Sequence, residues 1–142
     1  MKIGDQIPQL PNRNRWLSNN PLPKFTQKPL LVIFWSISCN QCHSLLLKLN
    51  QFYRQYEENL TILGVHMPRS AKDLPMGPLY SFIETSKLEY PIYADHKLEL
   101  SDAFGNRFVP KYYLFDEQGI LRYLGAGENG IRVIEFQLKR LL

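Results

Sequence analysis

Residues 30–42 have the sequence Leu30-Leu31-Val32-Ile33-Phe34-Trp35-Ser36-Ile37-Ser38-Cys39-Asn40-Gln41-Cys42. The first six residues are all apolar, which predicts a strand buried on both faces of a sheet. Apolar residues then recur at spacings of one and three from Leu45 to Tyr56, as on one face of a helix. A second apolar run at 60–66 predicts another buried strand. Strand, helix and strand in this order favour a parallel βαβ unit with a right-handed crossover, and therefore an α/β fold.

The remaining sequence predicts smaller elements around this unit. We expect a helix at 79–88, a strand at 92–94, a helix at 97–104, strands at 112–115 and 120–124, and a helix at 130–142. The turn Asp116-Glu117-Gln118-Gly119 favours a hairpin between the last two strands. Residues 1–28 contain four prolines and show no sustained period. They predict an irregular N-terminal arm packed on a domain that spans 29–142.

Composition excludes several classes of protein. The chain has 142 residues, 44% hydrophobic and 21% charged, which fits one globular domain and excludes whole-chain disorder. Two cysteines cannot form a disulfide scaffold or a four-cysteine zinc site. The net charge of +4 comes from basic residues scattered through 1–60, so we expect no nucleic-acid partner. No signal peptide or membrane span is visible, which predicts a cytoplasmic protein with no membrane partner.

The two cysteines form a Cys-x-x-Cys pair, Cys39 and Cys42, between the predicted strand and helix. This placement is typical of thioredoxin-like redox motifs. Free N–H groups and the dipole at a helix start stabilise a thiolate. They can lower a thiol pKa from about 8.5 to between about 3.5 and 7.5. We therefore expect Cys39 to attack a disulfide and Cys42, one turn further on, to resolve the mixed disulfide.

Taken together, Phe34 to Cys42, Val109-Pro110 and Phe115 to Gly119 resemble the TlpA/ResA-like thiol–disulfide oxidoreductases of the thioredoxin superfamily. Within that group, the segment Val65-His66-Met67-Pro68-Arg69-Ser70 is similar to the leaderless YkuV type. The resemblance covers roughly residues 29–142. It implies a thioredoxin-like fold, in which a central mixed sheet contains the parallel βαβ unit and a C-terminal β-hairpin, with helices on both faces.

The same resemblance implies the surroundings of the dithiol. Pro110 would be a cis-proline opposite the cysteines, and Val109 would offer backbone pairing to an extended substrate segment. Trp35 would lie beside the dithiol, and Ser38, Asn40 and Gln41 would complete the site. We further expect a monomer that acts on protein disulfides. Cytosolic placement favours their net reduction, with an upstream reductase as electron donor. The cofactor is the redox-active cysteine pair itself, and we expect no metal.

Three positions depart from the family pattern. Ser38 replaces the tryptophan that commonly precedes the first cysteine, Ile33 replaces the buried aspartate of thioredoxin, and Leu45 replaces the glutamate of the ResA type. The usual proton acceptors for Cys42 are therefore absent. His43 and His66 are the candidate acceptors, by proximity in sequence and by position at a strand end.

The sequence is also compatible with several other interpretations. Cys39 to His43 fits the CxxCH pattern of covalent haem, although no export signal accompanies it. Gly125 to Gly130 fits GxGxxG, but too few residues follow it to complete a dinucleotide fold, which favours a glycine-rich turn into the last helix. The functional alternatives are a peroxiredoxin-like peroxidase, with Cys39 attacking a hydroperoxide, and a non-catalytic binding or metal-holding module.

Overall fold

In the computed structural model, which describes residues 1–11, 17 and 27–142, five strands form one mixed sheet in the order β3-β2-β1-β4-β5. The strands are β1 (Leu30–Trp35), β2 (Thr61–His66), β3 (Ile92–Ala94), β4 (Lys111–Phe115) and β5 (Leu121–Ala126). The helices are α1 (Asn40–Tyr56), η1 (Ala71–Asp73), α2 (Met76–Ser86), α3 (Glu99–Phe104) and α4 (Ile131–Leu141). The fold predicted from the sequence, an α/β thioredoxin-like domain, is confirmed.

The centre of the sheet is β1, which pairs in parallel with β2 and antiparallel with β4. Next to these strands, β3 extends the parallel side and β5 forms a hairpin with β4. Every residue of β1 is at most 1% exposed, as its apolar run predicts. Each fully buried aliphatic or aromatic side chain of this kind contributes about 1.5–3 kcal/mol, so β1 anchors the elements on both of its sides.

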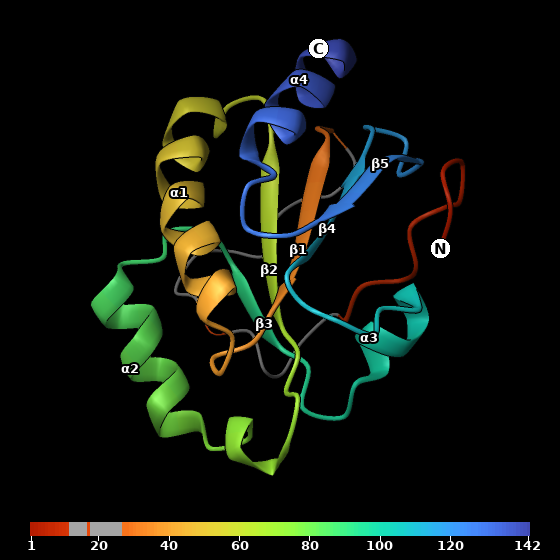
Figure 1. Ribbon diagram of the computed structural model, residues 1–142. Coiled ribbons are helices and arrows are strands. Elements are labelled where there is room, and N and C mark those ends of the chain that lie inside the picture. The colour runs from red at the N-terminus through yellow and green to blue at the C-terminus, as the bar shows by residue number, and fades with distance from the viewer. Residues whose placement is uncertain (12–16, 18–26) are drawn as a thin grey trace.

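Helices cover both faces of the sheet (Figure 1). One hydrophobic cluster joins Ile33, Trp35 and the neighbouring strands to α1, α2 and α4. The other joins Val32, Phe34 and their neighbours to α3 and to the N-terminal residues. The alternation of side chains along β1 therefore assigns Trp35 to the face that α1 covers.

The N-terminal residues lie along the turn of the β4–β5 hairpin. The N–H of Gly4 donates to the carbonyl of Leu121 at 2.9 Å, and the N–H of Ile7 donates to the carbonyl of Gly119 at 2.8 Å. Gln6 and Ile120 form an isolated antiparallel bridge. Of the predicted arm, residues 12–16 and 18–26 lie outside the described residues, and the division of the chain at 28/29 stays a prediction.

Element boundaries differ from the predicted ones by a few residues. Helix α2 begins at Met76, three residues early, because Pro78 is compatible with a first helical turn. Helix α3 begins at Glu99 rather than 97, because the Asp95 carboxylate accepts from the N–H groups of Leu100 and Ser101 and so defines its start. Near the C-terminus, β5 begins one residue late and continues to Ala126.

The glycines of the GxGxxG pattern make room for Tyr112. A Cβ at Gly130 would lie 1.8 Å from the Tyr112 hydroxyl oxygen, and a Cβ at Gly125 would lie 2.6 Å from the Tyr112 ring. That hydroxyl donates to the carbonyl of Ala126 at 2.8 Å. Gly127 has a φ of +95°, which favours glycine. Packing thus explains the pattern, as the prediction of a glycine-rich turn requires.

The packing around Tyr112 predicts that Gly130→Ala destabilises the protein. The added methyl group would displace Tyr112 and break its hydrogen bond, at a cost of about 1–3 kcal/mol for overpacking. Gly77→Ala is the matched control, because nothing lies within 4 Å of a Cβ at Gly77. In a helix, that change should be neutral or stabilising by up to about 1 kcal/mol. Urea unfolding measures both, and equal stability of the two variants would contradict the assigned role of Gly130.

Candidate active site

The cysteine pair lies where β1 leaves the sheet and α1 begins. Cys39 is the N-cap of α1, and Cys42 lies in its first turn. The two are joined by a disulfide, with their Cα atoms 5.2 Å apart. Cys39 is 6% exposed and Cys42 is fully buried. The structure therefore places both cysteines at the predicted strand-to-helix junction, with Cys39 as the outer one.

The start of α1 is arranged to favour a negative charge on Cys39. The backbone N–H of Cys42 donates to Cys39 Sγ at 3.1 Å. The fully described first turn of α1 contains no acidic residue, so no side-chain anion competes for the positive end of the helix dipole. Asn40 and Gln41 are both exposed. The sulfur of Cys39 thus occupies the position in which a capping oxygen usually accepts from the helix N–H groups.

Trp35 lies at the end of β1, buried in the same hydrophobic cluster as both cysteines. Its indole packs edge-on against the ring of His66, with the ring centroids 5.0 Å apart, and its centroid lies 5.5 Å from that of the Phe82 ring. Gly64 leaves room for this packing, because a Cβ there would lie 2.7 Å from Ile92 Cδ1 and 3.3 Å from Trp35 Nε1. Trp35 therefore shares a hydrophobic cluster with the cysteines and its ring forms part of the core, while its predicted role beside the dithiol stays a prediction.

The Val109-Pro110 peptide bond is cis. It directly precedes β4, whose first residue, Lys111, pairs with Phe34 in β1. The cis-proline thus lies at the same edge of the sheet as the cysteines. Val109 is half-buried and packs against both hydrophobic clusters. Both residues that the resemblance implied are at this edge.

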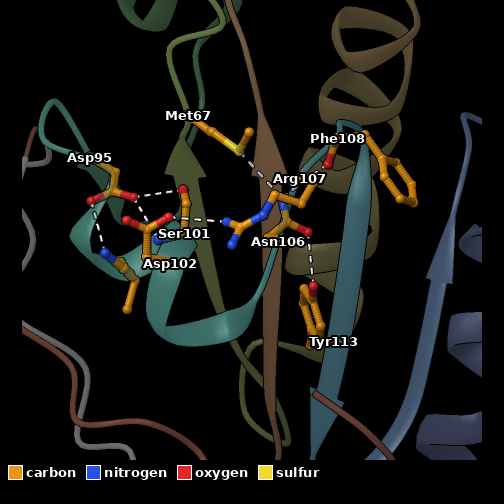
Figure 2. A network of polar contacts seen from close by, with 9 residues as sticks. Met67, Asp95, Ser101, Asp102, Asn106, Arg107, Phe108 and Tyr113 are labelled. Atoms are coloured by element: carbon orange, nitrogen blue, oxygen red, sulfur yellow. Dashed lines mark hydrogen bonds and ion pairs between the residues drawn. The ribbon is translucent and has the colours of Figure 1, made fainter.

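A buried amide holds the cis-proline loop, and sequence analysis did not identify it. Asn106, 1% exposed, donates from Nδ2 to the carbonyl of Phe108 at 2.9 Å and to Met67 Sδ at 3.3 Å (Figure 2). Its Oδ1 accepts from the Tyr113 hydroxyl at 2.8 Å. Since the partners are up to 39 residues away in sequence, no local pattern could have revealed this role.

Met67 also forms hydrogen bonds with the loop that carries the dithiol. Its N–H donates to the carbonyl of Trp35 at 2.7 Å, and its carbonyl accepts from the buried Ser36 hydroxyl. Met67 therefore connects the cysteine loop to the cis-proline loop through Asn106. This connection fixes the two loops relative to one another.

The two candidate proton acceptors have different environments. His66 is fully buried, and neither ring nitrogen has a hydrogen-bond partner among the described residues. Burial, the largest effect, lowers the pKa of His66 to about 4, partly offset by Asp73. His43 is half-buried, and its Nε2 lies 2.7 Å from the carbonyl of Ile37. A carbonyl only accepts, so Nε2 carries the proton and Nδ1 is the accepting nitrogen of the neutral ring.

Ser38 is exposed, and its side chain contacts Arg69 and Asp73, two residues that sequence analysis did not select.

In the described ranges, no group of three His, Cys, Asp or Glu side chains could hold a metal ion. No helix in the part of the chain that the structure describes is long and apolar enough to span a membrane.

Comparison with known proteins gives consistent matches. The AhpC/TSA family matches residues 3–124. The thiol-disulfide oxidoreductase YkuV of Bacillus subtilis (strain 168) is 36% identical over 144 aligned residues, covering 100% of this chain and 97% of YkuV. The thioredoxin-like protein SkfH of the same organism is 27% identical over 92% of each chain. A solved thioredoxin-like protein in the oxidized form has a TM-score of 0.87 at 35% identity, covering 99% of this chain and 97% of its own.

Both kinds of similarity extend over nearly the whole chain, and the cysteine pair stands at the helix start with the cis-proline at the same edge. The chain therefore belongs to the AhpC/TSA family and is a thioredoxin-like thiol–disulfide oxidoreductase.

Proposed function

We propose that Cys39 is the nucleophile and Cys42 the resolving cysteine in the reduction of protein disulfides. The observation that carries this assignment is the position of Cys39 at the N-cap of α1, where its sulfur accepts from the N–H of Cys42. Cys39 is 6% exposed to solvent, whereas Cys42 is 0% exposed. A substrate disulfide therefore meets Cys39 first.

Two exchange steps complete the reaction. The Cys39 thiolate attacks one substrate sulfur, a Cys39–substrate disulfide forms, and the other substrate sulfur leaves as a thiolate. The Cys42 thiolate then attacks Cys39, which forms the Cys39–Cys42 bond and releases the second substrate sulfur as a thiolate. The substrate gains two electrons and the protein loses two. The disulfide present in the structure is the product state of this sequence.

We assign substrate positioning to the edge formed by the cysteine loop and the cis-proline loop. Val109 lies immediately before the cis bond, where its backbone can pair with an extended substrate segment. Trp35 supports the floor of the site, while Ser38, Asn40 and Gln41 are exposed around Cys39. A protein disulfide in an extended segment fits such an edge, because backbone pairing is independent of substrate sequence.

Cys42 must lose a proton before it can attack Cys39, and we assign its acceptor to His43 rather than His66. A pKa of about 4 makes His66 a poor acceptor for a thiol, whose ordinary pKa is about 8.5. That gap of about 4.5 units corresponds to roughly 6 kcal/mol. His43 follows Cys42 directly in α1, where its backbone N–H donates to the carbonyl of Cys39 at 3.3 Å, and its ring Nε2 contacts the carbonyl of Ile37. Its Nδ1 is the available acceptor.

Trapping tests the roles of the cysteines. Cys42→Ser should accumulate mixed disulfides with substrate proteins, because the first step proceeds and the second cannot. Cys39→Ser should accumulate none. Non-reducing electrophoresis after incubation with a disulfide-containing protein measures both. The reverse pattern would contradict the assignment, as would a wild-type protein that consumes peroxide faster than it reduces disulfides or whose dithiol is inert.

The two histidines should give opposite signatures. His43→Gln should slow resolution of the mixed disulfide by about a hundredfold, the lower end of general-base effects. His66→Gln should leave that rate unchanged and alter stability instead. Stopped-flow measurement of resolution compares the variants directly. A rate loss in His66→Gln but not in His43→Gln would reverse the assignment.

The stability effect of His66 has a definite sign. The folded-state pKa of about 4 lies below the ordinary value of 6.5, so the unfolded state binds more protons between these pH values. The free energy of unfolding should therefore fall as pH drops from 6.5 toward 4, by up to about 3 kcal/mol from this residue. In His66→Gln this part of the fall should be missing, as urea unfolding at several pH values would show.

We further propose that the protein works as a cytoplasmic monomer that receives electrons from an upstream dithiol reductase. This direction requires a reduction potential more negative than about −220 mV, the upper end of the cytosolic glutathione poise. Equilibration with glutathione buffers measures the potential of the Cys39/Cys42 couple. A value of about −120 mV, as in a strong oxidant, would contradict net reduction and leave the exchange chemistry intact.

A further inference from the structure

A polar cluster joins the loop before Cys39 to the segment after β2. The Arg69 guanidinium donates from Nη2 to the carbonyl of Ser38 at 2.7 Å and from Nε to Ser38 Oγ at 3.1 Å. The Ser38 hydroxyl donates to Asp73 Oδ2 at 2.9 Å. Asp73 Oδ2 also accepts from the backbone N–H of Arg69 at 2.8 Å. Three residues therefore form a closed set of four hydrogen bonds.

Asp73 anchors this cluster. It is 2% exposed and lies in η1, which Ser70 caps by accepting from the N–H of Lys72. A carboxylate this buried is stable only when hydrogen-bonded, and its contacts with Ser38 and Arg69 serve that need. Asp73 thus fixes the backbone of Arg69, and Arg69 in turn holds the residue directly before Cys39.

The guanidinium also contributes charge. The ion pairs among the described residues involve Arg54, Arg107 and Arg122, so within this part of the chain no carboxylate pairs with the Arg69 guanidinium. Its planar fork makes two contacts to one residue, a geometry that lysine cannot reproduce. A nearby cation favours a thiolate, and Arg69 contacts the residue directly before Cys39, while the Asp73 carboxylate across the Ser38 hydroxyl opposes part of its charge.

We propose that Arg69, anchored by Asp73, holds the Ser38–Cys39 peptide in place and supplies positive charge that stabilises Cys39 as a thiolate. This inference rests on the proposed role of Cys39 as nucleophile. Arg69 is a positioning residue, because its contacts are to Ser38 and not to the reacting sulfur. It adds a side-chain cation to the stabilisation that the start of α1 already provides.

The test measures the thiolate of Cys39 directly, in Cys42→Ser, where Cys39 is the remaining thiol. Thiolate ultraviolet absorbance followed against pH gives its pKa. Arg69→Gln should raise that pKa by about one unit and slow the reaction with a small disulfide at neutral pH about threefold to tenfold. Arg69→Lys should give a smaller rise, since it keeps the charge without the fork. Ser38→Ala, which removes only the hydroxyl contacts, is the independent second variant and should also shift the pKa upward.

Arg54→Gln is the matched control. It removes the same charge from the last turn of α1, where Arg54 pairs with Glu89, and should leave the pKa of Cys39 unchanged. An unchanged pKa in both Arg69→Gln and Ser38→Ala would overturn the inference, as would an equal shift in Arg54→Gln. Because the probe is a small disulfide and the readout is a pKa, these results are independent of whether protein disulfides become trapped on Cys39.

Discussion

Burial of β1 on both faces determines where the chain can present a reactive sulfur. All six strand residues and the following Ser36 are at most 1% exposed, and the first exposed residue is Ser38. The chain must therefore leave the sheet and begin α1 within a few residues. Cys39 takes the N-cap position, and its sulfur replaces the capping oxygen as acceptor of the Cys42 N–H. The turn that ends β1 therefore also places the Cys39 sulfur at the positive end of the α1 helix dipole.

A correctly placed cysteine is useful only if the substrate edge is held with it. Met67 bonds to the cysteine loop through its backbone and to Asn106 through its sulfur, and Asn106 bonds to the carbonyl of Phe108 just before the cis-proline. On the other side of the loop, Arg69 and Asp73 hold Ser38. Met67, Arg69 and Asp73 all belong to the segment after β2. The pairing of β2 with β1 therefore places this segment between the cysteine loop and the cis-proline loop, the two parts of the proposed substrate edge.

What could be predicted from the sequence follows from the range of the interactions. The run at 30–35 and the helical spacing after it are local, and they predicted β1 and α1 because burial selects apolar residues at a fixed period. The hairpin turn was equally local, since the Asp116 carboxylate accepts from the N–H groups of Gln118 and Ile120. These signals were enough for the fold and the position of the cysteines.

The features of the site that could not be predicted from local sequence depend on contacts between residues far apart in the chain. A cis bond occurs at only about 5–6% of X–Pro bonds, so Pro110 was predicted through family resemblance and not from its neighbours. Asn106, Arg69 and Asp73 acquire their roles from partners 31 to 39 residues away. An isolated polar residue in a loop has no period that would identify it, and only the paired strands bring these groups together.

The replacement of the usual buried acids changes where the proton of Cys42 can go. Ile33 and Leu45 are both fully buried in the cluster that contains Cys42, so this side of the thiol is apolar. An apolar surrounding disfavours charge, both on the sulfur and on any base placed there, and the lowered pKa of His66 is one expression of it. This is consistent with the proposed transfer of the proton toward the exposed start of α1. His43, the residue after Cys42 in α1, is the acceptor that we propose there, so under this assignment the helix start would both stabilise the thiolate and receive the proton.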